Sequence, residues 1–174
     1  MLKTLLILVL ISSASMAQIL ISPLDAMLNT YSQSAQIKKK NVILTKDKAK
    51  LVQKKAKTKL KSKIFKYFIA KIDRKVVGYG ILVSRKVRSK NAVTMYFIDV
   101  NGMNEGIEVI AFNEPLEFMA SKKWTSQFEN IPVEKKLKIN KDIPTITGAT
   151  LTARSLVDGS RIASAFYEVM LKDK

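Results

Sequence analysis

The chain has 174 residues, 47% of them apolar, which suits a single domain with a buried core. Its 31 lysines and arginines exceed its 14 acidic residues and leave a net charge of +17. The absence of cysteine and histidine excludes disulfides, iron–sulfur clusters, c-type haem, thiolate or imidazole metal ligands and histidine-based catalysis. We therefore expect no metal site, and any redox chemistry outside the cytoplasm would need an organic cofactor.

Residues 1–17 have the pattern of a secretory signal peptide. Lys3 precedes the apolar run from Leu5 to Ile11, and small or polar residues then lead to Ala17. That run is much shorter than the roughly 20 apolar residues that span a bilayer, which favours cleavage after Ala17 over a retained anchor extending through residues 19–21. We expect an exported protein, in the periplasm or on the outer face of the cytoplasmic membrane.

Residues 18–63 are predicted to form a leading segment followed by a lysine-rich helix. Residues 18–36 show little periodicity, and we expect them to pack loosely. Thr45 is a predicted helix N-cap with Asp47 in the first turn, which favours an amphipathic helix at about residues 46–60. Its apolar stripe consists of residues at helical spacing: Ala49, Val52, Ala56 and Leu60.

The positive charge is concentrated in the same segment. Between Lys38 and Lys63 there are twelve lysines and one acid, a net charge of +11. The commonest role of such a run is a solvated surface, but it also suits docking on an anionic membrane surface or on an acidic electron-transfer partner. A nucleic acid is not expected as the partner, because the chain is predicted to be exported and its basic segment lacks interleaved aromatic residues.

Residues 64–174 are predicted to form one compact α+β domain. Four runs rich in β-branched and aromatic residues predict an antiparallel sheet of about four strands, at residues 64–72, 76–83, 93–100 and 107–112. We expect a short helix or turn at 122–128, and prolines make the segment 131–146 irregular. Residues 151–171 have the periodicity of a long C-terminal helix.

The string Thr147-Gly148-Ala149-Thr150-Leu151-Thr152 stands directly before that helix and has the features of an anion site. The N-terminus of a helix presents unpaired N–H groups and a partial positive charge. Gly148 and Ala149 are small enough for a phosphate to approach the backbone, and three threonine hydroxyls add donors. The alternative is an ordinary helix N-cap supplied by one of the threonines.

This string resembles the Ser/Thr-Gly-Ala-Thr motif of FMN-binding domains, such as the flavoprotein subunits of sodium-pumping quinone reductase and of the Rnf electron-transport complex. Further similarities to the family follow in its order: Val76–Gly80, Asp99–Gly102, Phe112–Pro115, Trp124 and Phe128. Pro144 and Ala153 depart from the family pattern, which usually has an acid and a serine there. The resemblance covers about residues 64–171.

The resemblance implies that residues 64–174 form an FMN-binding domain in which Thr150 carries FMN through a phosphoester bond. A dedicated flavin transferase would form that bond. Such a protein carries electrons to or from a membrane quinone-linked or other redox partner, and it needs no catalytic residue because the flavin supplies the chemistry. The residues expected to line the site with Thr150 are Thr147, Gly148, Ala149, Leu151 and Thr152.

Three further residues are candidates for the cofactor site. Glu114 would accept a hydrogen bond from a ribityl hydroxyl or order the loop beside the flavin, unless it is a solvated acid at a strand end. Trp124 would stack on the flavin or belong to the core. Tyr79, between Gly78 and Gly80, would lie near the cofactor where the glycines leave space, or mark a bend in a strand.

Two classes of function are consistent with the sequence. The first is an electron carrier with covalent FMN, rather than a stand-alone enzyme. The second is a non-enzymatic cationic binding protein that docks on membrane lipid or an acidic partner, with the Gly-Ala-Thr string merely starting a helix. A flavin-dependent reductase with its own small substrate is a third reading. Yellow colour that survives denaturation is expected only of covalent flavin.

Overall fold

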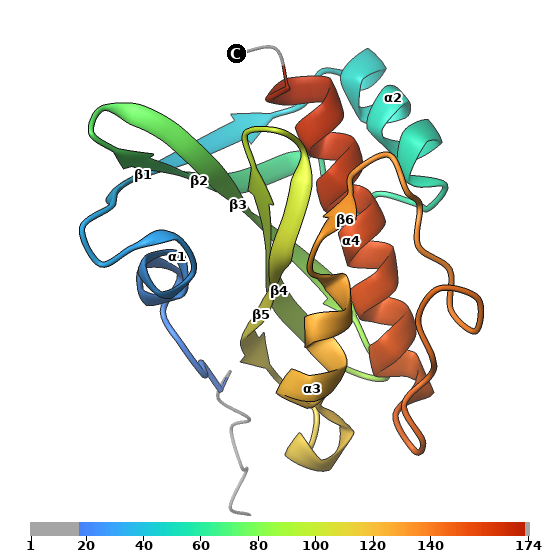
Figure 1. Ribbon diagram of the computed structural model, residues 1–174. Helices are drawn as coiled ribbons and strands as arrows, with labels where there is room; N and C mark the ends of the chain where they lie inside the picture. Colours follow the sequence, from blue (N-terminus) through green and yellow to red (C-terminus); the bar gives the residue numbers. More distant parts are fainter. Residues whose placement is uncertain (1–17, 173–174) are drawn as a thin grey trace, which may run out of the picture.

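The computed structural model describes residues 18–172, so the predicted signal peptide lies outside it (Figure 1). The fold is α+β, as predicted, with one antiparallel sheet in the order β1-β2-β3-β4-β5-β6. Neighbours in the sheet are neighbours in the chain, so the sheet is a simple meander. Its strands are β1 (Gln36–Ile43), β2 (Ile64–Ile72), β3 (Lys75–Lys86), β4 (Asn91–Asp99), β5 (Met103–Phe112) and β6 (Ile131–Pro132).

The predicted number of strands, about four, was too low, because β1 and β6 were not anticipated. β6 is only two residues long and carries no periodic pattern. β1 contains three consecutive lysines, and only Ile37 and Val42 in it are half-buried. It pairs with β2 from end to end, so residues 36–43 share one sheet with residues 64–112. Lysines suit this edge position because they oppose pairing with another chain.

Helices cover both faces of the sheet (Figure 1). The long helix α4 (Thr150–Met170) lies beside α2 (Lys46–Ala56) on one face, and α1 (Pro23–Tyr31) lies on the other. The helix α2 ends earlier than predicted because Lys57 takes a left-handed conformation, with a φ of 51°. Shorter helical turns connect β5 to β6: η1 (Leu116–Phe118), α3 (Lys122–Thr125) and η2 (Ser126–Phe128).

The leading segment packs closely against the sheet, not loosely as predicted. Met27 of α1 is completely buried. A Cβ atom at Gly78 would collide with the ring of Tyr31, and one at Gly80 would collide with the sulfur of Met27. The Tyr31 hydroxyl donates a hydrogen bond to the carbonyl oxygen of Tyr79 at 3.0 Å. The two glycines of β3 therefore make room for α1.

On the opposite face, α4 is held against the sheet along its length. The buried Tyr96 hydroxyl donates to the carbonyl oxygen of Leu156 at 2.9 Å, and a Cβ atom at Gly159 would collide with that hydroxyl. Further along the helix, the rings of Phe65 and Phe166 stack with their centroids 4.4 Å apart. These contacts fix the axis of α4, and with it the position of the motif at residues 147–152.

Candidate functional site

Gly148 makes the turn that leads into α4. Its φ is 75°, in the left-handed region that favours glycine. No atom lies within 4 Å of a Cβ atom built there, so the backbone conformation rather than lack of space calls for glycine. The Ala149 N–H donates to the carbonyl oxygen of Ile146 at 2.9 Å and closes the turn. The helix then begins at Thr150.

The N-terminus of α4 receives no cap from the side chain of any described residue. Its N-cap residue is Ala149, whose methyl group can accept no hydrogen bond. By contrast, α1 and α2 are capped by the hydroxyls of Ser22 and Thr45. The first N–H groups of α4 have no acceptor within the helix and are directed out of its start. The ordinary threonine N-cap considered for this motif does not form.

The three threonines of the motif have different surroundings. Thr152 is buried, and its hydroxyl donates to the carbonyl oxygen of Phe118 at 2.7 Å, which ties η1 to α4. Thr147 is exposed on the turn, and Thr150 is half-buried at the first position of the helix. Thr150 is therefore the hydroxyl in the first turn of α4 that is not committed to another group of the described chain.

A surface hollow of about 430 Å³ opens at the start of α4. Residues 148–152 line it together with Arg88 and Phe118. Leu151, an apolar residue, is 45% exposed there. The volume lies within the range of small-molecule sites, and the lining combines unpaired helix N–H groups, a threonine hydroxyl and apolar surface. Such a hollow suits an anionic group attached to an aromatic body.

Arg88 brings a second source of positive charge to this hollow. It lies in the turn between β3 and β4, and its guanidinium carbon is 4.6 Å from the centroid of the Phe118 ring. This cation–π contact holds the guanidinium beside the start of α4. Arg88 was not among the predicted site residues, because nothing in the local sequence shows that this turn meets the motif.

Glu114 orders the turn that carries Arg88. Its buried carboxylate accepts hydrogen bonds from the backbone N–H groups of Arg88 at 3.0 Å, Ser89 at 2.6 Å and Lys90 at 2.8 Å. These bonds, the one from Lys90 foremost, hold the pKa of Glu114 below its usual value. Glu114 is thus not a solvated acid: of its predicted roles, it takes that of ordering a loop beside the site.

Trp124 lies near the motif but does not line the hollow. Its indole N–H donates to the carbonyl oxygen of Pro144 at 3.1 Å, and its ring packs against Phe128 with centroids 5.6 Å apart. It thereby braces the segment that leads to Thr147. Pro144, which stands where FMN-binding domains usually have an acid, supplies the backbone carbonyl oxygen that accepts this bond.

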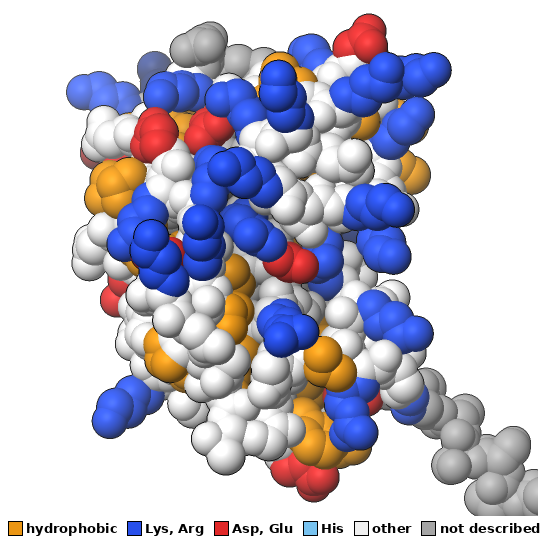
Figure 2. Space-filling view, turned by 90° about the vertical axis from the view of Figure 1, so that its right-hand side faces the viewer, with side chains coloured by type: hydrophobic (Ala, Val, Ile, Leu, Met, Phe, Trp, Pro, Cys, Tyr) orange, Lys and Arg blue, Asp and Glu red, His pale blue; other side chains and the backbone are white. Residues whose placement is uncertain are grey.

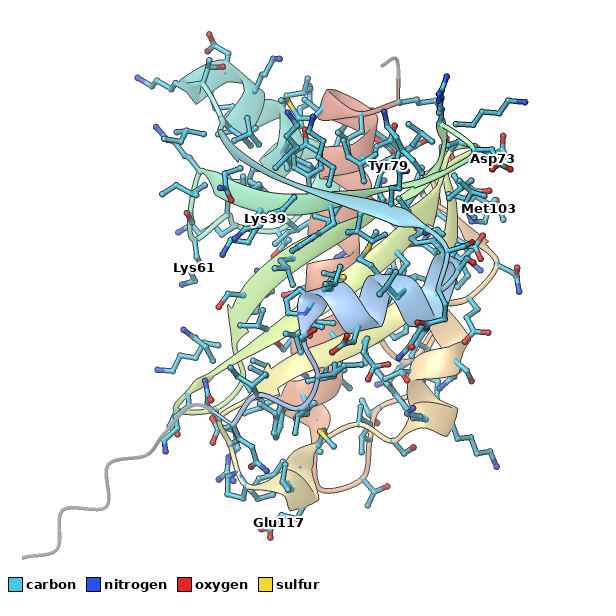
Figure 3. All side chains as sticks on the ribbon, turned by 90° about the vertical axis from the view of Figure 1, so that its left-hand side faces the viewer. Lys39, Lys61, Asp73, Tyr79, Met103 and Glu117 are labelled. Atoms are coloured by element: carbon cyan, nitrogen blue, oxygen red, sulfur yellow. The ribbon has the colours of Figure 1, made fainter. Side chains whose placement is uncertain are left out.

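Tyr79 lies far from the motif. Its ring contacts Tyr167, with centroids 5.8 Å apart, near the C-terminal end of α4. Along the helix axis Tyr167 is about 26 Å from Thr150, at 1.5 Å per residue. Figure 3 likewise shows Tyr79 at the opposite end of the molecule from Glu117 in η1. The structure therefore does not bring Tyr79 to the candidate site.

Residues 18–172 contain no group of three acidic side chains placed to hold a metal ion. No protein-family model matches the sequence, and a search of curated proteins found no match either. The resemblance to FMN-binding domains therefore depends on the residues of the sequence alone.

Proposed function

We propose that this protein carries FMN, esterified through its phosphate to Thr150, and serves as an exported electron-transfer protein. The observation that carries the proposal is the position of the Thr150 hydroxyl, in the first turn of an uncapped helix and in the wall of a hollow shared with Arg88. Five of the six residues of the motif that resembles that of FMN-binding domains, residues 148–152, line this hollow.

The electrostatics of the hollow favour a phosphate group. Unpaired N–H groups and the helix dipole place a partial positive charge at Thr150. The Arg88 guanidinium adds a full charge, and its planar fork of donors matches the oxygens of a phosphate. A phosphoester on Thr150 would keep a negative charge within reach of both. The exposed Leu151 supplies apolar surface for the flavin ring beside the phosphate.

The residues of this chain would bind and orient the cofactor, while the flavin ring would supply the electron chemistry. A covalent bond suits an exported protein because a dissociable cofactor would be lost by dilution. The proposal includes a flavin transferase that forms the ester and a redox partner, quinone-linked or other, at the membrane. Residues 1–17, on which the export prediction depends, lie outside the described chain.

The intact mass of protein isolated from its native compartment tests this function. The wild type should be heavier than its sequence by one esterified FMN, and the yellow colour should survive denaturation. Thr150→Val removes the hydroxyl at nearly constant volume and should remove both signals. Thr58→Val, at a half-buried threonine outside the motif and outside the lining of the hollow, is the matched control and should keep them. An unmodified wild type from a host that has the transferase would refute covalent attachment.

The second candidate function, a cationic binding protein without flavin, is favoured by a different observation. Of the twelve lysines between Lys38 and Lys63, only Lys55 forms an ion pair within the described chain. If the protein is colourless in its native host, this surface becomes the main candidate for its activity. If it is yellow, the same surface can still serve the carrier as a docking site.

A further inference from the structure

The lysines between Lys38 and Lys63 form a surface whose charge is not neutralised within the molecule. All twelve are exposed. Lys55 contacts Glu168 at 2.8 Å, and the other eleven have no acidic partner among residues 18–172. Figure 2 shows the Lys and Arg side chains crowded most densely over the upper half of the side that carries α2 and the C-terminal part of α4. This part of the protein can bind anions from outside.

Two adjoining hollows lie within this cationic surface, and the second has the more apolar lining. One of about 380 Å³ lies between α2 and the connection to β2, and Leu60 lines it among four lysines: Lys46, Lys50, Lys61 and Lys63. The other, of about 320 Å³, shares residues 60–62 with the first. Four apolar side chains line it, Ile64, Phe65, Val83 and Ile162, together with Lys66, Ser84 and Arg85. Together the two hollows form what we call the α2–β2 groove.

Two large apolar side chains are exposed at the groove, one in its lining and one beside it. Ile43 is 73% exposed and Ile64 is 65% exposed, and the two are partners in the register of β1 and β2. A single exposed apolar residue is ordinary, but this pair lies where the chain is most cationic. A solvated lysine face would gain nothing from isoleucines at this place.

We propose that the α2–β2 groove and its surrounding lysines dock the protein on an anionic phospholipid membrane. The lysines would contact lipid phosphates, and Ile43 and Ile64 would enter the boundary between headgroups and acyl chains. Charge complementarity favours an anionic surface. The apolar side chains at the groove favour lipid over an acidic protein, because binding an acidic protein would require only the lysines. No helix of residues 18–172 is long and apolar enough to cross a membrane.

The docked orientation would keep the Thr150 hollow away from the lipid. Ile162 in the groove lies about 18 Å beyond Thr150 along the axis of α4, at 1.5 Å per residue. The candidate redox site would then face the aqueous side and a partner there. The docking proposal does not depend on FMN at Thr150, and it can be tested on protein without flavin.

Sedimentation of the full chain with vesicles tests the docking. Vesicles of phosphatidylglycerol and phosphatidylcholine in equal parts should bind the protein, while pure phosphatidylcholine should leave it largely in solution. Each lysine near an anionic surface strengthens binding about fivefold at low salt, so Lys46, Lys50, Lys61 and Lys63 changed together to Gln should weaken it roughly 600-fold. The double change Ile43→Ser with Ile64→Ser should weaken it roughly tenfold, and added salt should change this loss little.

Matched control variants show whether binding depends on this surface or only on the total charge of the protein. The N-terminal segment is the same in all variants, so it cannot cause a difference between them. The charge control replaces four exposed lysines elsewhere by Gln: Lys122, Lys123, Lys138 and Lys141. The apolar control replaces Leu24 and Val100, which are 50% and 44% exposed, by Ser. Urea unfolding should show every variant folded.

Either of two results would overturn the proposal. One is equal binding to both kinds of vesicle by the wild type. The other is equal loss in a groove variant and its control, because the lysines or the isoleucines would then have no special part in docking.

Discussion

The contact between Gly159 and Tyr96 fixes how closely α4 approaches the sheet, and it gives a quantitative test of the structure. We expect Gly159→Ala to destabilise the protein although alanine is the better helix former. The added methyl group would collide with the Tyr96 hydroxyl, which donates a hydrogen bond to the Leu156 carbonyl oxygen at 2.9 Å. Tyr96 is buried, with only 1% of its surface exposed. The ring cannot move aside without breaking that bond in a buried place.

The magnitude follows from three opposing effects. Overpacking a core costs about 1–3 kcal/mol, and here the rigid surroundings place the cost near the upper end. Loss of the hydrogen bond adds about 1 kcal/mol, and the helix propensity of alanine returns about 1 kcal/mol. The net loss in the free energy of unfolding should be about 3 kcal/mol. For a chain of this length that corresponds to a fall in melting temperature of roughly 10 °C.

A double-mutant cycle isolates the contact. Tyr96→Phe removes the colliding oxygen and should by itself cost about 1 kcal/mol. In that background Gly159→Ala should cost at least about 1 kcal/mol less than in the wild type, since the ring carbon still crowds the methyl group. Urea unfolding followed by far-UV circular dichroism measures all four free energies.

Gly148→Ala is the control for this cycle. It meets no atom within 4 Å, and its cost arises only from the positive φ at that residue, so it should show no coupling to Tyr96→Phe. If Gly159→Ala is neutral or stabilising, or if its coupling to Tyr96→Phe is as small as that of the control, α4 does not lie as close to β4 as described.

Three further predictions concern the site and the ion pairs. Arg88→Gln should lower the amount of flavin bound per protein, measured by absorbance of the purified protein. Arg74→Gln, in the distant turn between β2 and β3, should not lower it, and an equal loss in both variants would show that Arg88 is not part of the site. Hydrogen bonds to Glu114 lower its pKa, so its contribution to stability is present above the unfolded value of about 4.3 and is lost as pH falls through the lower folded value. Glu114→Gln should therefore flatten the decline in unfolding free energy below about pH 5, and an unchanged pH profile would contradict the assigned bonds. At Glu168, desolvation raises the pKa, but hydrogen bonds from Lys136 and Lys55 outweigh it and hold the pKa low. Glu168→Gln should therefore also flatten the decline in unfolding free energy at acid pH. A steeper decline would show that desolvation prevails.

Much of the fold was predictable because its signals are local. The strand at Ile64–Ile72 is rich in β-branched and aromatic residues, and its bounds are those predicted. The helix α4 has apolar and small residues at helical spacing over six turns, so it too was predicted within one residue at each end. In both elements, the residues that pack are also the residues that form the pattern.

β1 was missed because its pattern is not local. Three lysines in a row have no preference for a strand, and the segment is extended only because the edge of β2 offers hydrogen-bond partners along its whole length. The packing of α1 is likewise set by a distant residue, since Met27 is buried because Gly80, more than fifty residues later, leaves space for it. Such pairings depend on which segments meet, which a short window of sequence cannot show.

The helix that begins at Thr147–Thr152 and the positive charge between Lys38 and Lys63 could be predicted, because helix signals and charge are properties of neighbouring residues. Three features could not be predicted: the helix start has no side-chain cap, Arg88 and not Tyr79 lies beside it, and the lysines lie around the α2–β2 groove. The physical reason is that each of these features joins residues from separate elements. Their distances are set by how the helices pack on the two faces of the sheet.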